Sequence, residues 1–332
     1  MASLGAIQML FRLACVGIVA AAVIGCSESA SPRNSSSRTV GKTSAKSQPA
    51  TSGSCLNLVN GLDTRDFPTV VRLVGIRGKS YGVCTGTFIS PTALITAAHC
   101  IDSSANGGVS IVAGDRLDFS QNIMAGSIKA IRAFTRGFIG STGDTSKTDT
   151  VNKDTAIVLF PRGAAKAYAA IAAAKPSPGV KATSVGYGLT DYYDEANAGQ
   201  NYDASKHYGS IDVVPSGDGS NIYVGDYTTQ ESEKVLGAKI VDSMGDSGGP
   251  LFVNNEITGT LSVGGSRDRA SDGLTAYFSV FVDINSADTR ELIRIANDAG
   301  ADIPPPGTPP TNLSSPSTAA PASNSDTHST CQ

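Results

Sequence analysis

The sequence predicts an all-β domain that is followed by one C-terminal helix. The 332 residues include 36 Gly and 16 Pro, no Trp, and only 6% aromatic residues. This composition favours many short strands joined by turns over long packed helices. Short apolar segments recur between clusters of Gly, Asn, Asp and Ser, which is the pattern of strands and turns. One apolar stripe at helical spacing follows them near the end of the chain.

The expected elements follow from this pattern in chain order. Each expected strand is a short run rich in Val, Ile, Leu, Thr and Ala that is bounded by turn residues. These strands are Thr69–Val74, Val83–Ile89, Ala93–Ala97, Val109–Ala113, Ala156–Phe160, Ala182–Gly186 and Thr258–Val263. In the expected helix, Ser286 is the N-cap, Leu292 and Ile295 belong to the apolar stripe, and Gly300 is the C′ residue.

The N-terminal segment has the features of an export signal. Arg12 precedes the apolar run Leu13–Gly25, which has signal-peptide length and is too short to span a bilayer comfortably. The run ends in Val-Ile-Gly followed by Cys26, which resembles the bacterial lipobox and implies that Cys26 carries a lipid. An ordinary cleaved signal is the alternative. We expect residues 1–25 to be a signal peptide and the protein to be exported and lipid-anchored, with the outer membrane as the expected location.

Two segments that flank the expected domain are poor in large apolar residues. Residues 26–57 are dense in Ser, Thr, Ala and Lys, and residues 302–332 are rich in Pro, Ser, Thr and Ala. Neither segment buries enough apolar surface to offset the loss of chain entropy on folding. We therefore expect a disordered tether at 26–57, a folded domain at 58–301 and a disordered tail at 302–332.

The charge of the chain argues against one class of partner. The formal net charge is -3 and the sequence pI is about 5.6. No broad cationic surface is therefore available for phosphate backbones, and we expect no nucleic-acid partner. No sequence pattern indicates a cofactor.

A glycine-rich motif at Gly245–Pro250 surrounds Ser247. Small residues on either side allow backbone N–H groups to approach a substrate carbonyl. A serine hydroxyl becomes a strong nucleophile only when a base lies within hydrogen-bond reach and a third group orients that base. The motif therefore predicts a nucleophile, provided that the chain also supplies the other two groups.

One histidine and one aspartate fit these two roles. Of the three histidines in the chain, His207 lies in a polar stretch that we expect to be a loop, and His328 lies in the expected tail. His99 follows an apolar strand and is the candidate base. Asp154 heads an apolar run that would hold it at the edge of a core, whereas the neighbouring acidic residues lie in a Ser/Thr/Gly-rich loop. Asp154 is the candidate orienting group.

These three segments, in the order His, Asp, Ser, resemble the trypsin/chymotrypsin family of serine endopeptidases. The resemblance covers residues 58–301 and includes four further motifs, Leu58–Gly61, Cys84–Ser90, Gly186–Gly188 and Ser262–Gly264. It implies two six-stranded antiparallel β-barrels of the chymotrypsin-like kind with a C-terminal helix. It also implies protein or peptide substrates that are cleaved through an acyl-enzyme. The alternative is an inactive homologue that acts as a surface binding or adhesion module.

The resemblance assigns a role to each candidate residue. Ser247 would attack the scissile carbonyl, His99 would take and return its proton, and Asp154 would fix the imidazole tautomer. The N–H groups of Gly245 and Ser247 would form the oxyanion hole.

The resemblance also bears on cysteines and metals. Cys84 and Cys100 match a disulfide of the family, whereas the bridges that often surround the nucleophile loop are absent. The Asp115–Asn122 loop lacks the pair of glutamates that calcium-binding members place there. We therefore expect one disulfide beside the histidine and no metal site.

The residue six positions before the nucleophile lies at the floor of the family's specificity pocket, and here it is Val241. An apolar floor predicts small or medium apolar P1 residues. Gly264, in the substrate-pairing strand Ser262–Gly264, would leave the entrance open, and Thr275 would narrow the depth. Asp242 offers the alternative, because its carboxylate could bind a basic P1 side chain.

Activation in this family depends on the residue before the nucleophile, which is Asp246 here. The resemblance implies an ion pair between Asp246 and a new α-amino group at Leu58, made by an activating protease. The preceding residue is Asn57, not Arg or Lys, so a different protease cuts there or Asp246 uses another partner. A Cys55–Cys331 disulfide would keep the cut domain attached to the lipidated segment. Free or intermolecular thiols are the alternative.

Overall fold

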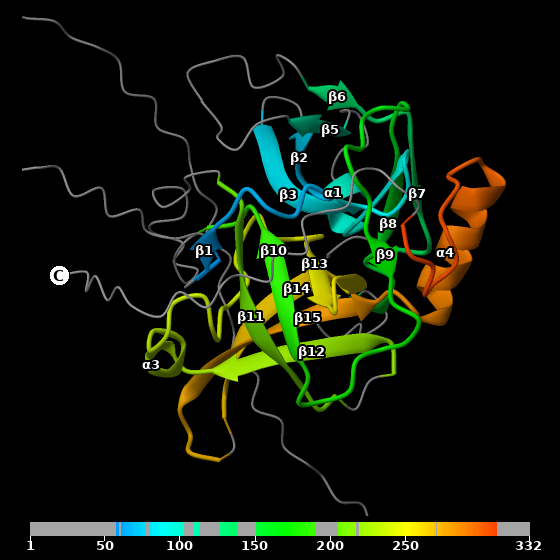
Figure 1. Cartoon of the computed structure of the whole chain (residues 1–332). Coiled ribbons are helices and arrows are strands. Elements are labelled where there is room, and N and C mark those ends of the chain that lie inside the picture. Colours follow the sequence, from blue (N-terminus) through cyan, green and yellow to red (C-terminus); the bar gives the residue numbers. More distant parts are fainter. Residues whose placement is uncertain are drawn as a thin grey trace, which may run out of the picture. The chain divides into compact units, whose positions relative to one another are not determined.

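The computed structural model describes residues 58–59, 61–77, 80–102, 109–112, 127–138, 151–189, 205–216, 219–269 and 271–310. The expected signal peptide, the tether and the cysteines at 26, 55 and 331 lie outside the described residues. Within the described ranges, no helix is long and apolar enough to cross a membrane. Two β-sheets, packed side by side, make up most of the described chain, and one longer helix follows them (Figure 1).

The first sheet collects strands from the N-terminal part of the domain in the order β6-β5-β2-β3-β4-β8-β7, with antiparallel neighbours. Its strands are β2 (Val70–Arg77), β3 (Ser80–Phe88), β4 (Ala93–Thr96), β5 (Val109–Val112), β6 (Ile128–Lys129), β7 (Arg132–Thr135) and β8 (Ala156–Leu159). Every residue of β4 and β8 is buried, as expected for short and almost wholly apolar segments in the middle of a sheet.

The second sheet closes into a six-stranded barrel. Its order is β1-β11-β10-β13-β14-β15-β12, and an additional pairing of β11 with β12 closes the ring. The strands are β1 (Leu62–Asp63), β10 (Lys181–Gly186), β11 (His207–Val214), β12 (Asn221–Tyr227), β13 (Pro250–Val253), β14 (Glu256–Asp268) and β15 (Thr275–Asp283). A short strand, β9 (Ala170–Ile171), pairs with β14 in parallel. Closure protects the backbone groups that an edge strand would expose.

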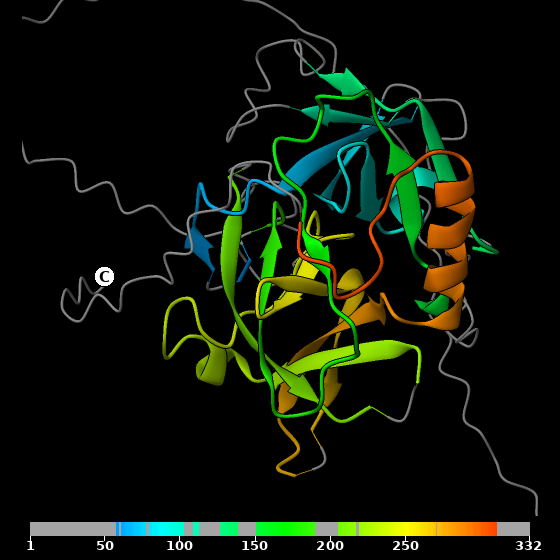
Figure 2. The same cartoon turned by 45° about the vertical axis from the view of Figure 1, so that its right-hand side comes forward.

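Three helices complete the described elements, namely α1 (His99–Asp102), α3 (Thr229–Ser232) and α4 (Ala287–Asp298). The predicted N-cap of α4 is confirmed, because the Ser286 side chain accepts a hydrogen bond from the Thr289 N–H. Gly300 follows the helix with φ +87°, the left-handed conformation that glycine adopts easily after a helix end. Figure 2 shows α4 against the first sheet, beside β7 and β8.

The core is continuous across the two sheets and α4. One buried cluster combines Ile95 and Ile157 of the first sheet with Val185 and Phe252 of the barrel and Leu292 of α4. A second cluster fills the barrel around Ile211 and Phe281. The interface between the sheets is therefore part of the core, and the residues at its rim are held by both sheets.

The sequence predictions of strands and of the final helix agree with these elements, but two predictions are wrong. The expected tail begins too early, because Ile303 is buried at 4% exposure and exchanges two hydrogen bonds with Asn297. The chain is described as far as residue 310, where the Gly307 N–H donates to the Ile171 carbonyl. His207 does not lie in a loop; it opens β11, is fully buried, and its Nε2 lies 2.6 Å from an Asp63 carboxylate oxygen.

Candidate active site

Strand pairing brings His99 and Asp154 together. In the antiparallel pair β4–β8, Thr96 lies opposite Ala156, so the C-terminal end of β4 adjoins the N-terminal end of β8. His99 lies just after β4 and Asp154 lies just before β8. A turn closed by the Asp154 N–H and the Val151 carbonyl directs the chain into β8.

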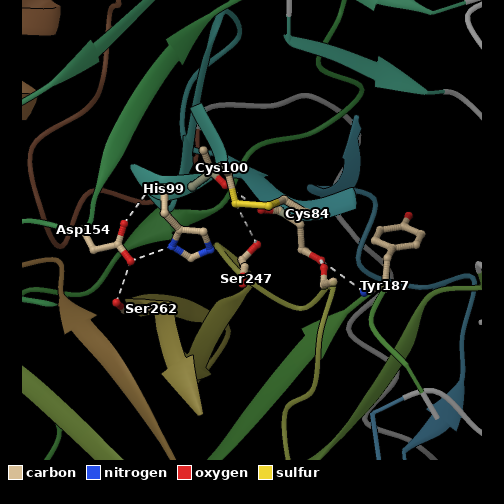
Figure 3. The surroundings of a disulfide bond; sticks show 10 residues. Cys84, His99, Cys100, Asp154, Tyr187, Ser247 and Ser262 are labelled. Atoms are coloured by element: carbon tan, nitrogen blue, oxygen red, sulfur yellow. Dashed lines mark hydrogen bonds and ion pairs between the residues drawn. A yellow bond between two sulfur atoms is a disulfide. The ribbon is translucent and has the colours of Figure 1, made fainter. Parts of the chain in front are cut away.

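Asp154 binds His99 through both of its carboxylate oxygens. Oδ1 accepts from the His99 backbone N–H at 2.8 Å, and Oδ2 lies 2.7 Å from His99 Nδ1. The Ser262 hydroxyl donates to the same Oδ2 at 2.6 Å (Figure 3). Asp154 is only 4% exposed, so these partners replace water at the carboxylate. This arrangement favours the tautomer in which Nδ1 carries the hydrogen and Nε2 is a free base.

Ser247 lies on the other side of the imidazole. Figure 3 shows the His99 ring between the Asp154 carboxylate and Ser247. The nucleophile loop is fixed to β14, because the Gly248 N–H donates to the Leu261 carbonyl and the Leu261 N–H donates to the Gly249 carbonyl, both at 2.8 Å. The structure therefore brings the three predicted residues to one place.

Two backbone donors beside Ser247 remain available. Gly245 has φ +99°, a conformation that a side chain would strain. Neither the Gly245 N–H nor the Ser247 N–H donates to any described residue. Donors in such positions can stabilise negative charge on an oxygen held nearby.

Asp246 points away from Ser247 into a buried site. Its carboxylate accepts from the Gly188 N–H at 2.7 Å and from the Ser243 N–H at 2.8 Å. A Cβ atom at Gly186 or Gly188 would overlap this carboxylate, which explains the two glycines. Burial, and after it the negative charge of Asp242, raise the pKa of Asp246 well above its usual value.

The predicted pocket residues Val241 and Asp242 are both buried, at 5% and 6% exposure. Asp242 Oδ1 accepts from the Ser184 hydroxyl at 2.5 Å. Its Oδ2 has no partner with good hydrogen-bond geometry among the described residues, although the nearby Ser279 hydroxyl interacts with this carboxyl and opposes the rise of its pKa. Burial raises the pKa of Asp242, and the bond from Ser184 opposes this rise.

Gly264 and Thr275, the two residues predicted to shape the pocket, lie far apart along the β14–β15 hairpin. Gly264 lies next to the Asp242 carbonyl and pairs with Ser279 across β14 and β15. Thr275 is exposed and pairs with Asp268 at the far end of this hairpin, so it does not narrow the pocket. Ser279, and not Thr275, lies opposite Gly264, because β14 and β15 continue well beyond Gly264.

The expected N-terminal residue Leu58 is buried at 0% exposure. Val59 and Val241 exchange two backbone hydrogen bonds, at 3.0 and 3.3 Å. Leu58 and Val59, which precede β1, therefore lie beside Val241, the residue before Asp242.

Cys84 and Cys100 form the expected disulfide, with Cα atoms 6.2 Å apart. A loop of this size gives about 3 kcal/mol in the chain-entropy model. With His99, these cysteines are the one group in the described chain that could hold a metal ion. Both sulfurs are already bonded to each other and His99 Nδ1 faces Asp154, so these residues do not form a metal site as they stand.

Sequence reasoning missed the side-chain role of Thr85. This residue is fully buried in β3, and its hydroxyl donates to the Gly245 carbonyl and accepts from the Tyr187 N–H. The only sequence signal was a hydroxyl residue between Cys84 and Gly86, in the segment that leads to the histidine motif. A single sequence does not reveal which backbone groups such a hydroxyl meets.

Comparisons with known proteins agree with this geometry. A family model described as Trypsin matches residues 61–285. A trypsin from Saccharopolyspora erythraea is 27% identical over 68% of this chain and 96% of its own length. An uncharacterized peptidase from Corynebacterium glutamicum (strain R) is 27% identical over 60% of this chain and 60% of its own length. Mouse neuropsin, a serine protease expressed in the limbic system of the brain, has a similar fold, with a TM-score of 0.50 and 15% identity over 72% of this chain and 98% of its own. The chain belongs to the trypsin family of serine proteases.

Proposed function

We propose that this protein is an exported serine endopeptidase that hydrolyses peptide bonds through an acyl-enzyme. Ser247 Oγ attacks the scissile carbonyl while His99 Nε2 takes its proton. Asp154 holds Nδ1–H and stabilises the imidazolium that forms. His99 then gives the proton to the leaving amine, and a water molecule repeats the sequence on the acyl-enzyme.

Backbone donors stabilise the charge that develops during this attack. The N–H groups of Gly245 and Ser247 are free of described partners and belong to the loop that carries the nucleophile. Hydrogen bonds to the oxyanion strengthen as the carbonyl becomes tetrahedral, so they lower the barrier rather than tighten substrate binding alone.

The observation that supports this proposal best is the set of three hydrogen bonds around Asp154. His99 N, His99 Nδ1 and Ser262 Oγ all lie within 2.8 Å of its carboxylate oxygens. A buried aspartate held in this way keeps Nε2 directed at Ser247. Such an arrangement is what a general base needs.

A fluorophosphonate probe tests the proposal, because it reacts only with an activated serine. We expect the mature protein to be labelled and Ser247→Ala to lose both labelling and hydrolysis, with kcat lower by on the order of 10⁶. Ser266→Ala, in the exposed C-terminal half of β14, is the matched control. A folded wild-type protein that is never labelled would instead support an inactive binding module.

We propose a preference for apolar P1 residues over basic ones. Val241 supplies the apolar floor, and Asp242 is turned toward Ser184 with a raised pKa, so its carboxyl is less readily ionised than an exposed one. Cleavage of a peptide library would measure this preference. A dominant Arg or Lys preference that Asp242→Asn removes would contradict it, because Oδ2 would then be the group that binds the basic side chain.

Anchoring is a separate part of the proposal. Lipidation of Cys26 would attach the domain to a membrane after export. Incorporation of a labelled fatty acid that Cys26→Ala abolishes would support it. We also propose an activating cut before Leu58 and a Cys55–Cys331 disulfide that keeps the cut enzyme attached. Mass spectrometry of the mature protein with and without reductant would detect this bridge.

A further inference from the structure

We propose that Thr85 is a positioning residue for the oxyanion hole. Its hydroxyl holds the Gly245 carbonyl, and this keeps the backbone donors of the nucleophile loop directed at the substrate. The inference rests on the proposed peptidase function and adds a residue outside the three predicted catalytic groups.

Every polar atom of Thr85 is hydrogen bonded, and the residue is 0% exposed. Its N–H donates to the Ser247 carbonyl at 2.8 Å, and its hydroxyl donates to the Gly245 carbonyl at 2.9 Å. The same hydroxyl accepts from the Tyr187 N–H at 3.1 Å, and the Thr85 carbonyl accepts from the Thr96 hydroxyl at 2.7 Å. Thr85 therefore connects β3 of the first sheet with two loops of the second.

The two carbonyls that Thr85 binds flank Asp246. Gly245 has φ +99° and no side chain, so its own conformational preference does little to fix its orientation. Hydrogen bonds from other residues must therefore fix the orientation of the Gly245 backbone. The Leu189 N–H holds the Met244 carbonyl at 2.9 Å, and in a planar trans peptide the Gly245 N–H then points the opposite way. Thr85 fixes the next carbonyl along the chain and so limits rotation about Gly245.

The acceptor bond of the hydroxyl adds a second link. Tyr187 precedes Gly188, whose N–H holds the Asp246 carboxylate. One hydroxyl thus joins the turn that anchors Asp246 to the loop that carries Ser247. Valine has nearly the shape of threonine but can make neither bond, whereas serine can make both.

The test compares kcat and KM of full-length variants on one peptide ester. We expect Thr85→Val to lower kcat by about 10- to 100-fold with little change in KM. This is less than the 10²- to 10³-fold loss for deleting an oxyanion donor, because the donors themselves remain. Thr85→Ser should restore kcat to within a few-fold of the wild-type value.

Thr87→Val is the matched control. Thr87 lies in the same strand, is also 0% exposed, and its hydroxyl has no hydrogen-bond partner among the described residues. We expect its kcat to stay at the wild-type value. A kcat of Thr85→Val near that of Thr87→Val, or an equal loss in Thr85→Ser and Thr85→Val, would overturn the proposal.

Folding is checked by thermal unfolding, with Thr85→Ala as a second variant without the hydroxyl. If neither Thr85→Val nor Thr85→Ala folds while Thr85→Ser does, the role of Thr85 is structural and the proposal fails. Failure of the peptidase function itself is distinguishable, because the wild-type protein would then hydrolyse nothing.

Discussion

Ser262 shows how one hydroxyl tunes the candidate base. It is buried in β14 and donates at 2.6 Å to the Asp154 oxygen that also faces His99 Nδ1. Ser262 belongs to the segment that the family resemblance predicts to pair with substrate, and its side-chain bond to Asp154 adds a second role. Its backbone and its side chain therefore serve different parts of the site.

We expect Ser262→Ala to lower kcat by about 10- to 100-fold without raising KM. A hydrogen bond to a charged group contributes about 1.5–3 kcal/mol, and 1.4 kcal/mol corresponds to a factor of ten. The backbone of residue 262 is unchanged, so pairing with substrate is retained. Steady-state kinetics measures both parameters. An increase in KM with kcat unchanged would show that Ser262 acts through substrate pairing alone.

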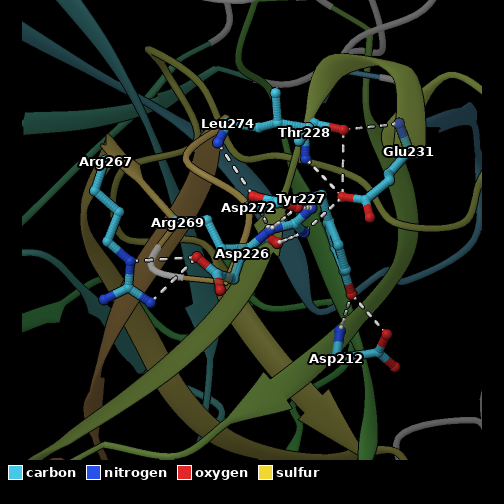
Figure 4. Close-up of polar contacts among 9 residues, drawn as sticks. All are labelled: Asp212, Asp226, Tyr227, Thr228, Glu231, Arg267, Arg269, Asp272 and Leu274. Carbon is cyan, nitrogen blue, oxygen red and sulfur yellow. Dashed lines mark hydrogen bonds and ion pairs between the residues drawn. The ribbon is translucent and has the colours of Figure 1, made fainter.

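At the scale of elements, Arg269 ties the β14–β15 hairpin to α3. Its guanidinium donates to Glu231 Oε2 at 2.9 Å, to the Asp226 carbonyl at 3.2 Å and to the Asp272 carboxylate (Figure 4). Glu231 also closes the capping box of α3 with Thr228. The bond from Arg269 lowers the pKa of Glu231 to about 2. This cluster fixes the turn between β14 and β15, at the end of the hairpin beyond Ser262–Gly264.

We expect Arg269→Gln to raise KM a few-fold for long peptides, to leave KM for short esters unchanged, and to leave kcat unchanged for both. The hairpin would lose its attachment to α3, whereas Asp154 and His99 would keep theirs. Arg267→Gln is the control, because Arg267 is more exposed than Arg269. Within the described chain its hydrogen bonds go to the Asp226 side chain alone, and its guanidinium lies over the Phe278 ring of the same hairpin. Equal effects of the two variants on KM would contradict a specific role for Arg269.

The elements that sequence reasoning found are those with continuous apolar runs. β4 and β8 are fully buried, so their composition alone indicates them. The predicted strands did not include β7, β11, β12, β13 and β15. In β11 and β12, Gly, Ser and Asp interrupt the alternation, and β12 contains a bulge near Gly225. Thr275 was misplaced for a related reason. The length of the β14–β15 hairpin decides which residue faces Gly264, and only the fold fixes that register.

At the scale of the whole molecule, the candidate site belongs to both sheets. His99 and Asp154 come from the first sheet, and Ser247 comes from the barrel. Their relative positions depend on the shared core and on links such as that from Thr85 to Ser247. The three motifs could therefore be found in the sequence, but the bonds that hold them in register could not.

Buried acidic residues connect activation with stability. In the uncut chain, burial and the neighbouring Asp242 raise the pKa of Asp246 well above the usual value. The folded protein then keeps a proton that the unfolded chain has released. Asp246 therefore favours folding below its unfolded pKa of about 3.9, and this contribution is lost as pH rises through the folded pKa. A cut before Leu58 would create an ammonium group at Leu58. The next residue, Val59, pairs with Val241 through two backbone hydrogen bonds, so the new N-terminus begins in the segment beside the buried acidic residues.

We expect the cut to change the pH dependence of stability. An ammonium group beside Asp246 would favour the charged carboxylate and lower its pKa, so the free energy of unfolding of the cut protein should fall less as pH rises than that of the intact protein. Urea unfolding between about pH 4 and about pH 8 measures both forms, and N-terminal sequencing identifies the cut. Asp246→Asn in the intact chain should also flatten the profile, since it removes the proton-binding group. If cut and intact proteins have the same pH profile while Asp246→Asn differs from both, Asp246 uses another partner and the enzyme needs no cut at Leu58.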